Sequence, residues 1–110
     1  KDISKKSTQF IVGVLYSTST GANKLVEQLP KNAKIAHKAG SSDKNKDGLT
    51  GAENDIAIIT LPNGKHYAIS VFVSDSKESE TVNCKMISDI SKVVYDGLSN
   101  PKKGFFFNWK

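Results

Sequence analysis

A repeat of apolar residues near the C-terminal end restricts the fold more than any other feature of the sequence. Apolar residues recur there at every third or fourth position, which is the period of an α-helix with one apolar face. They are Val82, Met86, Ile87, Ile90, Val93, Val94 and Leu98. Ser79 is a suitable N-cap, Glu80 fits the first turn, and Asn100-Pro101 ends the pattern. The sequence therefore predicts an amphipathic helix of about five turns.

Three β-strands are predicted before this helix. They span residues 34–39, 55–61 and 66–73. Pro62-Asn63-Gly64 joins the second and third strands as a hairpin, since Asn-Gly tolerates the positive φ angles of tight turns. A polar loop, residues 43–53, joins the first two. The third strand is an almost continuous apolar run, which predicts burial on both of its faces.

Two helices are predicted before the strands. The first runs from about Ser7, a good N-cap, to Tyr16. The residues expected on its buried face are Phe10, Val14 and Leu15. A short second helix stops at Pro30. Its apolar residues are Leu25, Val26 and Leu29. The resulting prediction is an α+β fold, in which helices pack on a three-stranded antiparallel sheet.

Size and composition limit the classes of protein that fit this sequence. A chain of 110 residues with 37% hydrophobic and 25% charged residues suits one small globular domain. Cys84 is the single cysteine, so no internal disulfide forms. The net charge of +5 comes from scattered lysines without any arginine, which argues against nucleic-acid binding.

Neither a membrane span nor a secretion signal is found in these residues. No stretch approaches the roughly 20 apolar residues that cross a bilayer. The N-terminal segment Lys1–Lys6 is not followed by the apolar region of a signal peptide. If the parent protein is periplasmic or secreted, its signal is therefore expected outside this chain.

Asp43-Lys44-Asn45-Lys46-Asp47-Gly48 matches the first half of a calcium-binding loop. The complete loop needs a carboxylate at its twelfth position, where this sequence has Asn54, and Glu53 comes one residue early. The segment also joins two predicted strands and not two helices. A polar hairpin loop is therefore the favoured interpretation, and a calcium-binding module is the alternative.

The segment His37-Lys38-Ala39-Gly40-Ser41-Ser42 is informative because of the blocks around it. These blocks are residues 18–25, 29–30, 54–64, 68–73 and 75–76. In their order and spacing they resemble the C-terminal region of class A serine β-lactamases, most closely the branch found in Bacteroides-type bacteria. The resemblance extends over most of the chain, from about Ser7 to Leu98.

The resemblance implies a fold, a reaction and site residues. The fold would be the C-terminal part of the serine β-lactamase and penicillin-binding transpeptidase fold. The reaction would be hydrolysis of the β-lactam amide through a serine acyl-enzyme, giving antibiotic resistance, without a cofactor or a metal ion. Lys38 would attract the substrate carboxylate and support the serine, and Ser41 would give a backbone N–H to the oxyanion hole. The other implied substrate-binding residues are Thr20, Lys24, Ala39, Gly40 and Ser42.

Two residues depart from the family pattern. Ala39 stands where the family has threonine or serine, so a hydrogen bond to the substrate carboxylate, worth about 1.5–3 kcal/mol, is missing. Lys24 stands where arginine is usual, which replaces a two-pronged donor with a point charge. Both changes weaken recognition of the same carboxylate.

The catalytic serine of the family has no counterpart in the expected place. Ser74-Asp75-Ser76-Lys77 fits the Ser-x-x-Lys pattern formally, but it follows the third strand and is not expected to be catalytic. Neither a Ser-Asp-Asn motif nor a histidine–cysteine cluster with zinc spacing is present. His37 and His66 are predicted to lie on strand surfaces.

The predicted organisation is a β-lactamase-like portion over residues 1–100 and an aromatic tail over residues 101–110. The tail could cover a sheet face, mark a partner surface, or be a non-native extension. The partners expected for this portion are a β-lactam substrate and the missing N-terminal part of the domain, and the portion is expected to be inactive alone. Two alternatives stay open, namely a fragment of a penicillin-binding transpeptidase or carboxypeptidase and a non-catalytic binding module.

Overall fold

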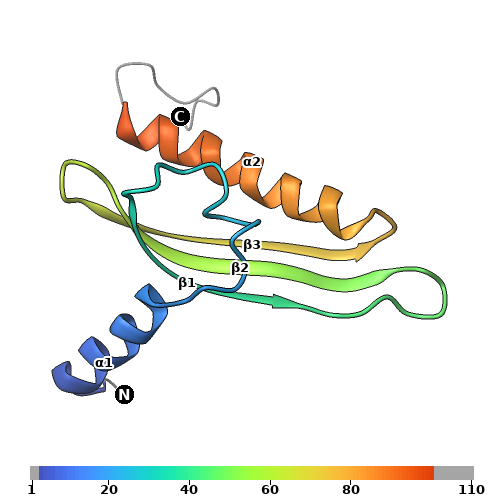
Figure 1. Cartoon of the computed structure of the whole chain (residues 1–110), viewed down its shortest axis with the longest axis horizontal. Helices are drawn as coiled ribbons and strands as arrows, with labels where there is room; N and C mark the ends of the chain where they lie inside the picture. Colours follow the sequence, from blue (N-terminus) through green and yellow to red (C-terminus); the bar gives the residue numbers. More distant parts are fainter. Residues whose placement is uncertain (1–2, 101–110) are drawn as a thin grey trace, which may run out of the picture.

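The structure is a computed structural model that describes residues 3–100. Its elements are, in order, α1 (Lys5–Tyr16), β1 (Lys34–Ser41), β2 (Thr50–Thr60), β3 (His66–Ser76) and α2 (Glu80–Ser99). The strands form one antiparallel sheet in the order β1-β2-β3, with α2 lying along the sheet and α1 beside β1 (Figure 1). The predicted α+β fold class is confirmed. The aromatic tail predicted over residues 101–110 lies outside the described residues.

The alternation of side chains along β2 determines which face of the sheet is buried. Ala57 and Ile59 point into the core, whereas Ile56 and Ile58 are exposed on the opposite face. Cross-strand pairing extends this alternation to both neighbours, since Ile59 pairs with Ile35 in β1 and Tyr67 in β3. One face of the sheet is therefore packed, and the described residues leave the other largely uncovered.

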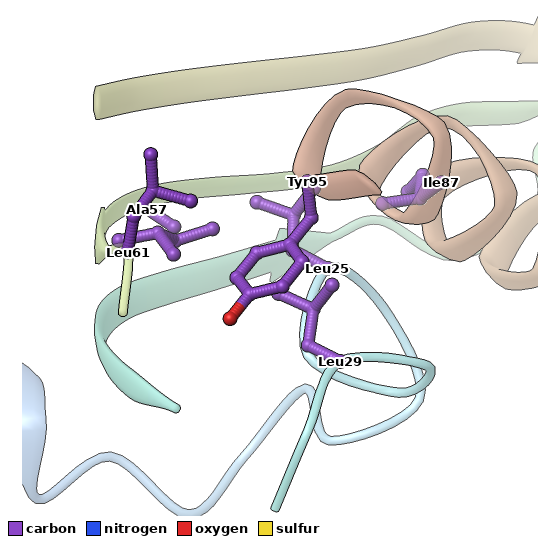
Figure 2. Close-up of a cluster of buried hydrophobic side chains, with 7 residues drawn as sticks. Leu25, Leu29, Ala57, Leu61, Ile87 and Tyr95 are labelled. Atoms are coloured by element: carbon purple, nitrogen blue, oxygen red, sulfur yellow. The ribbon is translucent and has the colours of Figure 1, made fainter. Parts of the chain in front are cut away.

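The core lies between the packed face of the sheet, α2 and the segment 20–30. Its buried members are Leu25, Leu29, Ala57, Ile59, Leu61, Ile87 and Tyr95. Figure 2 shows the ring of Tyr95 and the side chain of Leu25 beside each other, between α2 and the strands. Three separate parts of the chain thus remove apolar surface from water at one place.

Helix α1 begins earlier and is less buried than predicted. Its N-cap is Ser4 and not Ser7, and the Ser4 Oγ accepts a hydrogen bond from the Ser7 backbone N–H at 3.0 Å. The predicted buried face is wrong, because Phe10 is 72% exposed and Val14 is 52% exposed. Among the described elements α1 contacts only β1, so Leu15 and Tyr16 near its C-terminal end are half-buried and most of its other apolar side chains are exposed.

Residues 20–29 form consecutive turns and not the predicted short helix. Backbone hydrogen bonds join residues three apart, as from the Lys24 N–H to the Gly21 carbonyl at 3.1 Å. Gly21 has a φ of +73°, which an α-helix does not accept. The predicted burial of Leu25 and Leu29 is nevertheless confirmed.

Strands β2 and β3 are longer than predicted, and one feature of β3 differs. β2 begins at Thr50, which pairs with Ser76, so the preceding loop is shorter than the predicted 43–53. The prediction that β3 is buried on both faces is wrong, since Phe72 is 68% exposed on the uncovered face. The hairpin at 62–64 is confirmed by a φ of +86° at Gly64.

Helix α2 has the predicted caps, but a different face is buried. Ser79 accepts a hydrogen bond from the Val82 N–H at 3.2 Å, and the helix ends at Asn100. Its buried residues are Asn83, Cys84, Ile87, Ser88, Ser91 and Tyr95. Large apolar residues that the periodicity placed on the buried face are exposed, namely Val82, Met86, Ile90 and Val93. Small residues let the helix approach closely, and the Ser91 Oγ donates to the Leu25 carbonyl at 2.7 Å.

No helix within residues 3–100 is long and apolar enough to cross a membrane.

Candidate active site

A cleft lies beside β1, one of the two edge strands of the sheet. No strand among the described residues pairs with the outer edge of β1, which leaves its peptide groups accessible. The cleft has a volume of about 340 Å³. Six residues predicted for the site line it, namely Thr20, Lys24, Lys38, Ala39, Gly40 and Ser41. Ser42 lines an adjoining cleft of about 320 Å³, which also borders Ser41.

Lys38 and Gly40 give this edge a positive charge and open space. Lys38 is exposed, and its Nζ donates a hydrogen bond to the Ala39 carbonyl at 2.6 Å. A Cβ added at Gly40 would meet nothing within 4 Å, so the strand is uncrowded there. An exposed ammonium beside an open strand edge can attract an anion and let it lie against the main chain.

The ammonium of Lys24 is buried under the strand. Lys24 is 3% exposed, and its Nζ donates to the Gly40 carbonyl at 2.9 Å and to the Asn54 carbonyl at 3.1 Å. The same Nζ lies 2.8 Å from Oε2 of Glu53, which is also buried. Binding of a substrate carboxylate by Lys24 stays a prediction, and it would require the ammonium to leave or share these partners.

Asp55 connects β2 to the turns that carry Thr20. This carboxylate is fully buried, and its Oδ2 accepts the Leu25 backbone N–H at 3.1 Å. Its Oδ1 lies 3.3 Å from Nδ1 of His37 in β1. The prediction that His37 lies on a strand surface is wrong, since it is 5% exposed, whereas His66 is exposed as predicted. Asp55 thus fixes the position of the segment 20–29 relative to β1.

Comparison with known proteins identifies the family. Residues 1–98 match the model of the beta-lactamase enzyme family. The chain belongs to this family. It is 50% identical over 98 residues to "Beta-lactamase VEB-1" of Pseudomonas aeruginosa, covering 89% of this chain and 32% of the relative. It is 43% identical over 94 residues to a beta-lactamase of Bacteroides uniformis, covering 86% and 32%. The chain thus spans about a third of the length of these relatives.

Solved structures of class A β-lactamases have the same fold. The structure of the TLA-3 extended-spectrum beta-lactamase superposes with a TM-score of 0.87 at 52% identity, over 88% of this chain and 35% of that one. A class A beta-lactamase from Bacteroides cellulosilyticus superposes with a TM-score of 0.85 at 41% identity, over 89% and 35%. The predicted class A family, including its Bacteroides relatives, is confirmed, and this family consists of hydrolases.

The loop that resembles half a calcium site contains a lysine ammonium instead. The Nζ of Lys44 donates to the carbonyls of Gly48 and Glu78, at 3.3 and 2.9 Å, and to the hydroxyl of Thr50 at 3.2 Å. The Oδ1 of Asn45 accepts the backbone N–H groups of Asp47 and Leu49. Because the Asn45 oxygen, a ligand at the third position of a calcium loop, already accepts two backbone N–H groups, the structure favours the hairpin-loop interpretation.

One cluster near the cleft has groups of the kind that bind metal ions. Ligand atoms of Glu53, Glu80 and Cys84 lie within 4.8 Å of one another. Burial raises the pKa of the Cys84 thiol, and the charge of Glu53 raises it further, so the thiolate is disfavoured. Lys24 lies against Glu53 and would repel a metal ion. These residues therefore do not favour a metal centre in this β-lactamase family member.

The segment Ser74-Asp75-Ser76-Lys77, which fits the Ser-x-x-Lys pattern, lies apart from β1. Ser74 pairs with Ala52 in β2, and the Ser42 N–H donates to the Ala52 carbonyl, so β2 separates Ser74 from the end of β1. Two strand spacings amount to roughly 9.5 Å. A hydroxyl at that distance cannot attack a substrate bound at the outer edge of β1.

Sequence reasoning missed Glu53 and Asp55. Both lie on β2 at alternate positions in line with Ala57 and Ile59, which point into the core. Two carboxylates on the buried face of a strand require partners, so this alternation was a signal of buried ion pairs. The predicted loop over residues 43–53 includes Glu53, which separates it from the alternation in β2.

Proposed function

We propose that this chain provides one wall of the active site of a class A serine β-lactamase. That enzyme hydrolyses the β-lactam amide through a serine acyl-enzyme and confers resistance to β-lactam antibiotics. The observation that carries the proposal is the cleft at the outer edge of β1, which six of the predicted site residues line together.

The residues of the wall perform two tasks in this mechanism. The ammonium of Lys38 attracts the carboxylate of the β-lactam and holds it beside the strand. The backbone N–H of Ser41 donates to the oxyanion that forms when the serine attacks the lactam carbonyl. Thr20 and Ser42 provide hydroxyls at the two ends of the wall, and Gly40 leaves room for the acyl group. The attacking serine comes from outside these residues.

We infer that the chain acts with the N-terminal part of a complete domain and is inactive alone. Its share of the relatives' length, about a third, supports this inference. Two apolar surfaces without a partner among residues 3–100 also support it. The uncovered sheet face carries Ile56, Ile58 and Phe72, and the outer side of α2 carries Val82, Met86, Ile90 and Val93. The complete protein would act in the periplasm or after secretion.

Reconstitution with an N-terminal partner tests the proposal. The 110-residue chain is assayed with nitrocefin alone and after mixing with the N-terminal two thirds of VEB-1, which is 50% identical over the shared region. Hydrolysis is expected only in the mixture. If the mixture forms a complex but does not hydrolyse nitrocefin, the proposed function is wrong.

Two lysine variants test the role of Lys38, and the second of them is the matched control. Lys38→Ala is expected to lower kcat/KM of the mixture about tenfold or more, because a charged contact with the substrate is lost. Lys46→Ala removes an exposed charge from the loop and should have no effect. A penicillin-binding transpeptidase, the alternative, would give acylation without rapid turnover in the same assay.

A further inference from the structure

We propose that Glu53, acting through Lys24, positions the peptide group that provides the oxyanion-hole donor. This inference rests on the proposed function, since it assumes that Ser41 provides that donor. It assigns Glu53 a role in the reaction without contact with the substrate, and it assigns Lys24 to the strand and not to the substrate carboxylate.

The peptide bond between Gly40 and Ser41 joins the group that Lys24 binds to the predicted oxyanion-hole donor. The carbonyl of Gly40 and the N–H of Ser41 belong to one planar unit, and all peptide bonds described are trans. In a trans peptide these two groups point in opposite directions. The Ser42 N–H donates to the Ala52 carbonyl, and the pair of Gly40 with Asn54, two residues along, is therefore also of the hydrogen-bonded kind. The Gly40 carbonyl thus points toward β2, and the Ser41 N–H points toward the outer edge and the cleft.

Lys24 fixes the inner end of this unit. Its Nζ donates to the Gly40 carbonyl at 2.9 Å and to the Asn54 carbonyl at 3.1 Å, so one ammonium links β1 and β2 at a single register pair. A positive charge on a carbonyl also draws electrons from the attached N–H and makes it a stronger donor. Lys24 therefore both orients the Ser41 N–H and increases its partial positive charge.

Glu53 compensates the charge of the buried Lys24 ammonium. Its Oε2 lies 2.8 Å from the Lys24 Nζ, and the two side chains are only 3% and 4% exposed. An uncompensated ammonium at this depth would be strongly unfavourable and would move toward water or lose its proton. The carboxylate thus keeps the charge in place under the Gly40 carbonyl.

The test compares single and double variants in the assembly of this chain with the N-terminal part of VEB-1. Glu53→Leu and Lys24→Met are each expected to lower both the unfolding midpoint and the kcat for nitrocefin. The double variant Lys24→Met/Glu53→Leu removes both charges, so its unfolding midpoint should recover. Its kcat should stay about tenfold below the unmodified assembly with KM within about twofold, because oxyanion stabilisation acts only in the transition state.

The control is Glu78→Gln, an exposed glutamate outside the cleft, which should change neither quantity. Recovery of kcat together with the unfolding midpoint in the double variant would overturn the proposal, because the pair would then serve stability alone.

A second measurement separates this inference from the proposed function. In the 110-residue chain, the Ser41 amide proton is followed by nuclear magnetic resonance. It should move upfield in the double variant as the polarising charge is lost, whether or not any mixture hydrolyses nitrocefin. An unchanged Ser41 resonance would refute the positioning role, whereas an inactive unmodified mixture would refute only the proposed function.

Discussion

Gly21 lies so close to Ala39 that a Cβ added at Gly21 would be 2.6 Å from the Cβ of Ala39. Non-bonded carbon atoms do not approach to this distance. The turn containing Thr20 can therefore lie against β1 only because residue 21 has no side chain. The positive φ of +73° at Gly21 adds a second requirement for glycine. This contact determines where Thr20 lies relative to Lys38 and Gly40.

Gly21→Ala is therefore expected to destabilise the fold. A clash in a packed region costs about 1–3 kcal/mol, and a left-handed backbone adds about 1–2 kcal/mol for a non-glycine residue. Urea unfolding of the chain measures the change. Gly13→Ala is the control, because Gly13 is in α1 with nothing within 4 Å of an added Cβ, and alanine should stabilise that helix by about 0.5–1 kcal/mol. Equal effects at the two glycines would contradict the close approach.

Ala39→Thr is expected to raise kcat/KM for nitrocefin about tenfold in the reconstituted enzyme. The change restores the hydroxyl that the resemblance to the family predicts at this position. Steady-state kinetics with the unmodified assembly as reference measure the gain. If turnover does not improve, Ala39 does not border the substrate carboxylate.

Asp55→Ala should destabilise the chain by about 2–4 kcal/mol. It leaves the buried Leu25 N–H without an acceptor and removes the charged partner of His37. Chemical unfolding measures the loss. Asp43→Ala removes an exposed loop carboxylate and should change stability by less than about 0.5 kcal/mol. A similarly small loss at Asp55 would show that its contacts contribute little.

The hydroxyl of Tyr67 should make the free energy of unfolding depend on pH in the alkaline range. Burial raises the pKa of its hydroxyl from 10.0 to about 12, with smaller contributions from Tyr95 and Asp96. Between these values the folded chain keeps a proton that the unfolded chain loses, so the free energy of unfolding falls as the pH rises from about 10 to 12. Tyr67→Phe should weaken this dependence. A tyrosinate absorbance titration in which Tyr67→Phe removes no late component would contradict it.

Cys84 reports whether the chain folds without a partner. The thiol is 2% exposed and burial raises its pKa, so a disulfide reagent should react slowly with the folded chain and rapidly in urea. The ratio of the two rates measures protection. Equal rates would show that the chain alone does not form the core around α2.

The fold could be predicted from periodicity where local signals and burial agree. The Asn63-Gly64 turn, the Ser79 cap and the order of the three strands depend on local residues, and the structure has them as expected. Prediction failed where burial depends on neighbours from other parts of the chain. The apolar face of α1 and the outer residues of α2 have the pattern of buried surfaces, yet the described residues provide nothing to cover them.

For the site, the sequence could indicate which residues line the cleft beside β1, but not which groups each side chain contacts. Lys38 and Lys24 are both predicted to bind the substrate, yet Lys38 is exposed and Lys24 is only 3% exposed. The difference depends on Glu53, which approaches from a neighbouring strand only after folding. The alternation along β2 indicates that Glu53 needs a buried partner, but it does not indicate that this partner is Lys24.

The uncovered sheet face has a consequence for how the chain tolerates mutation. In a protein that acts by itself, polar replacements at Ile56, Ile58 and Phe72 would be neutral or would improve solubility, because water already reaches these positions. In a protein whose complete form covers that face, the same replacements would be selected against as strongly as those at Ile59 or Ile87. The substitutions that survive selection for antibiotic resistance at these three positions would therefore record whether another layer of the protein covers the sheet.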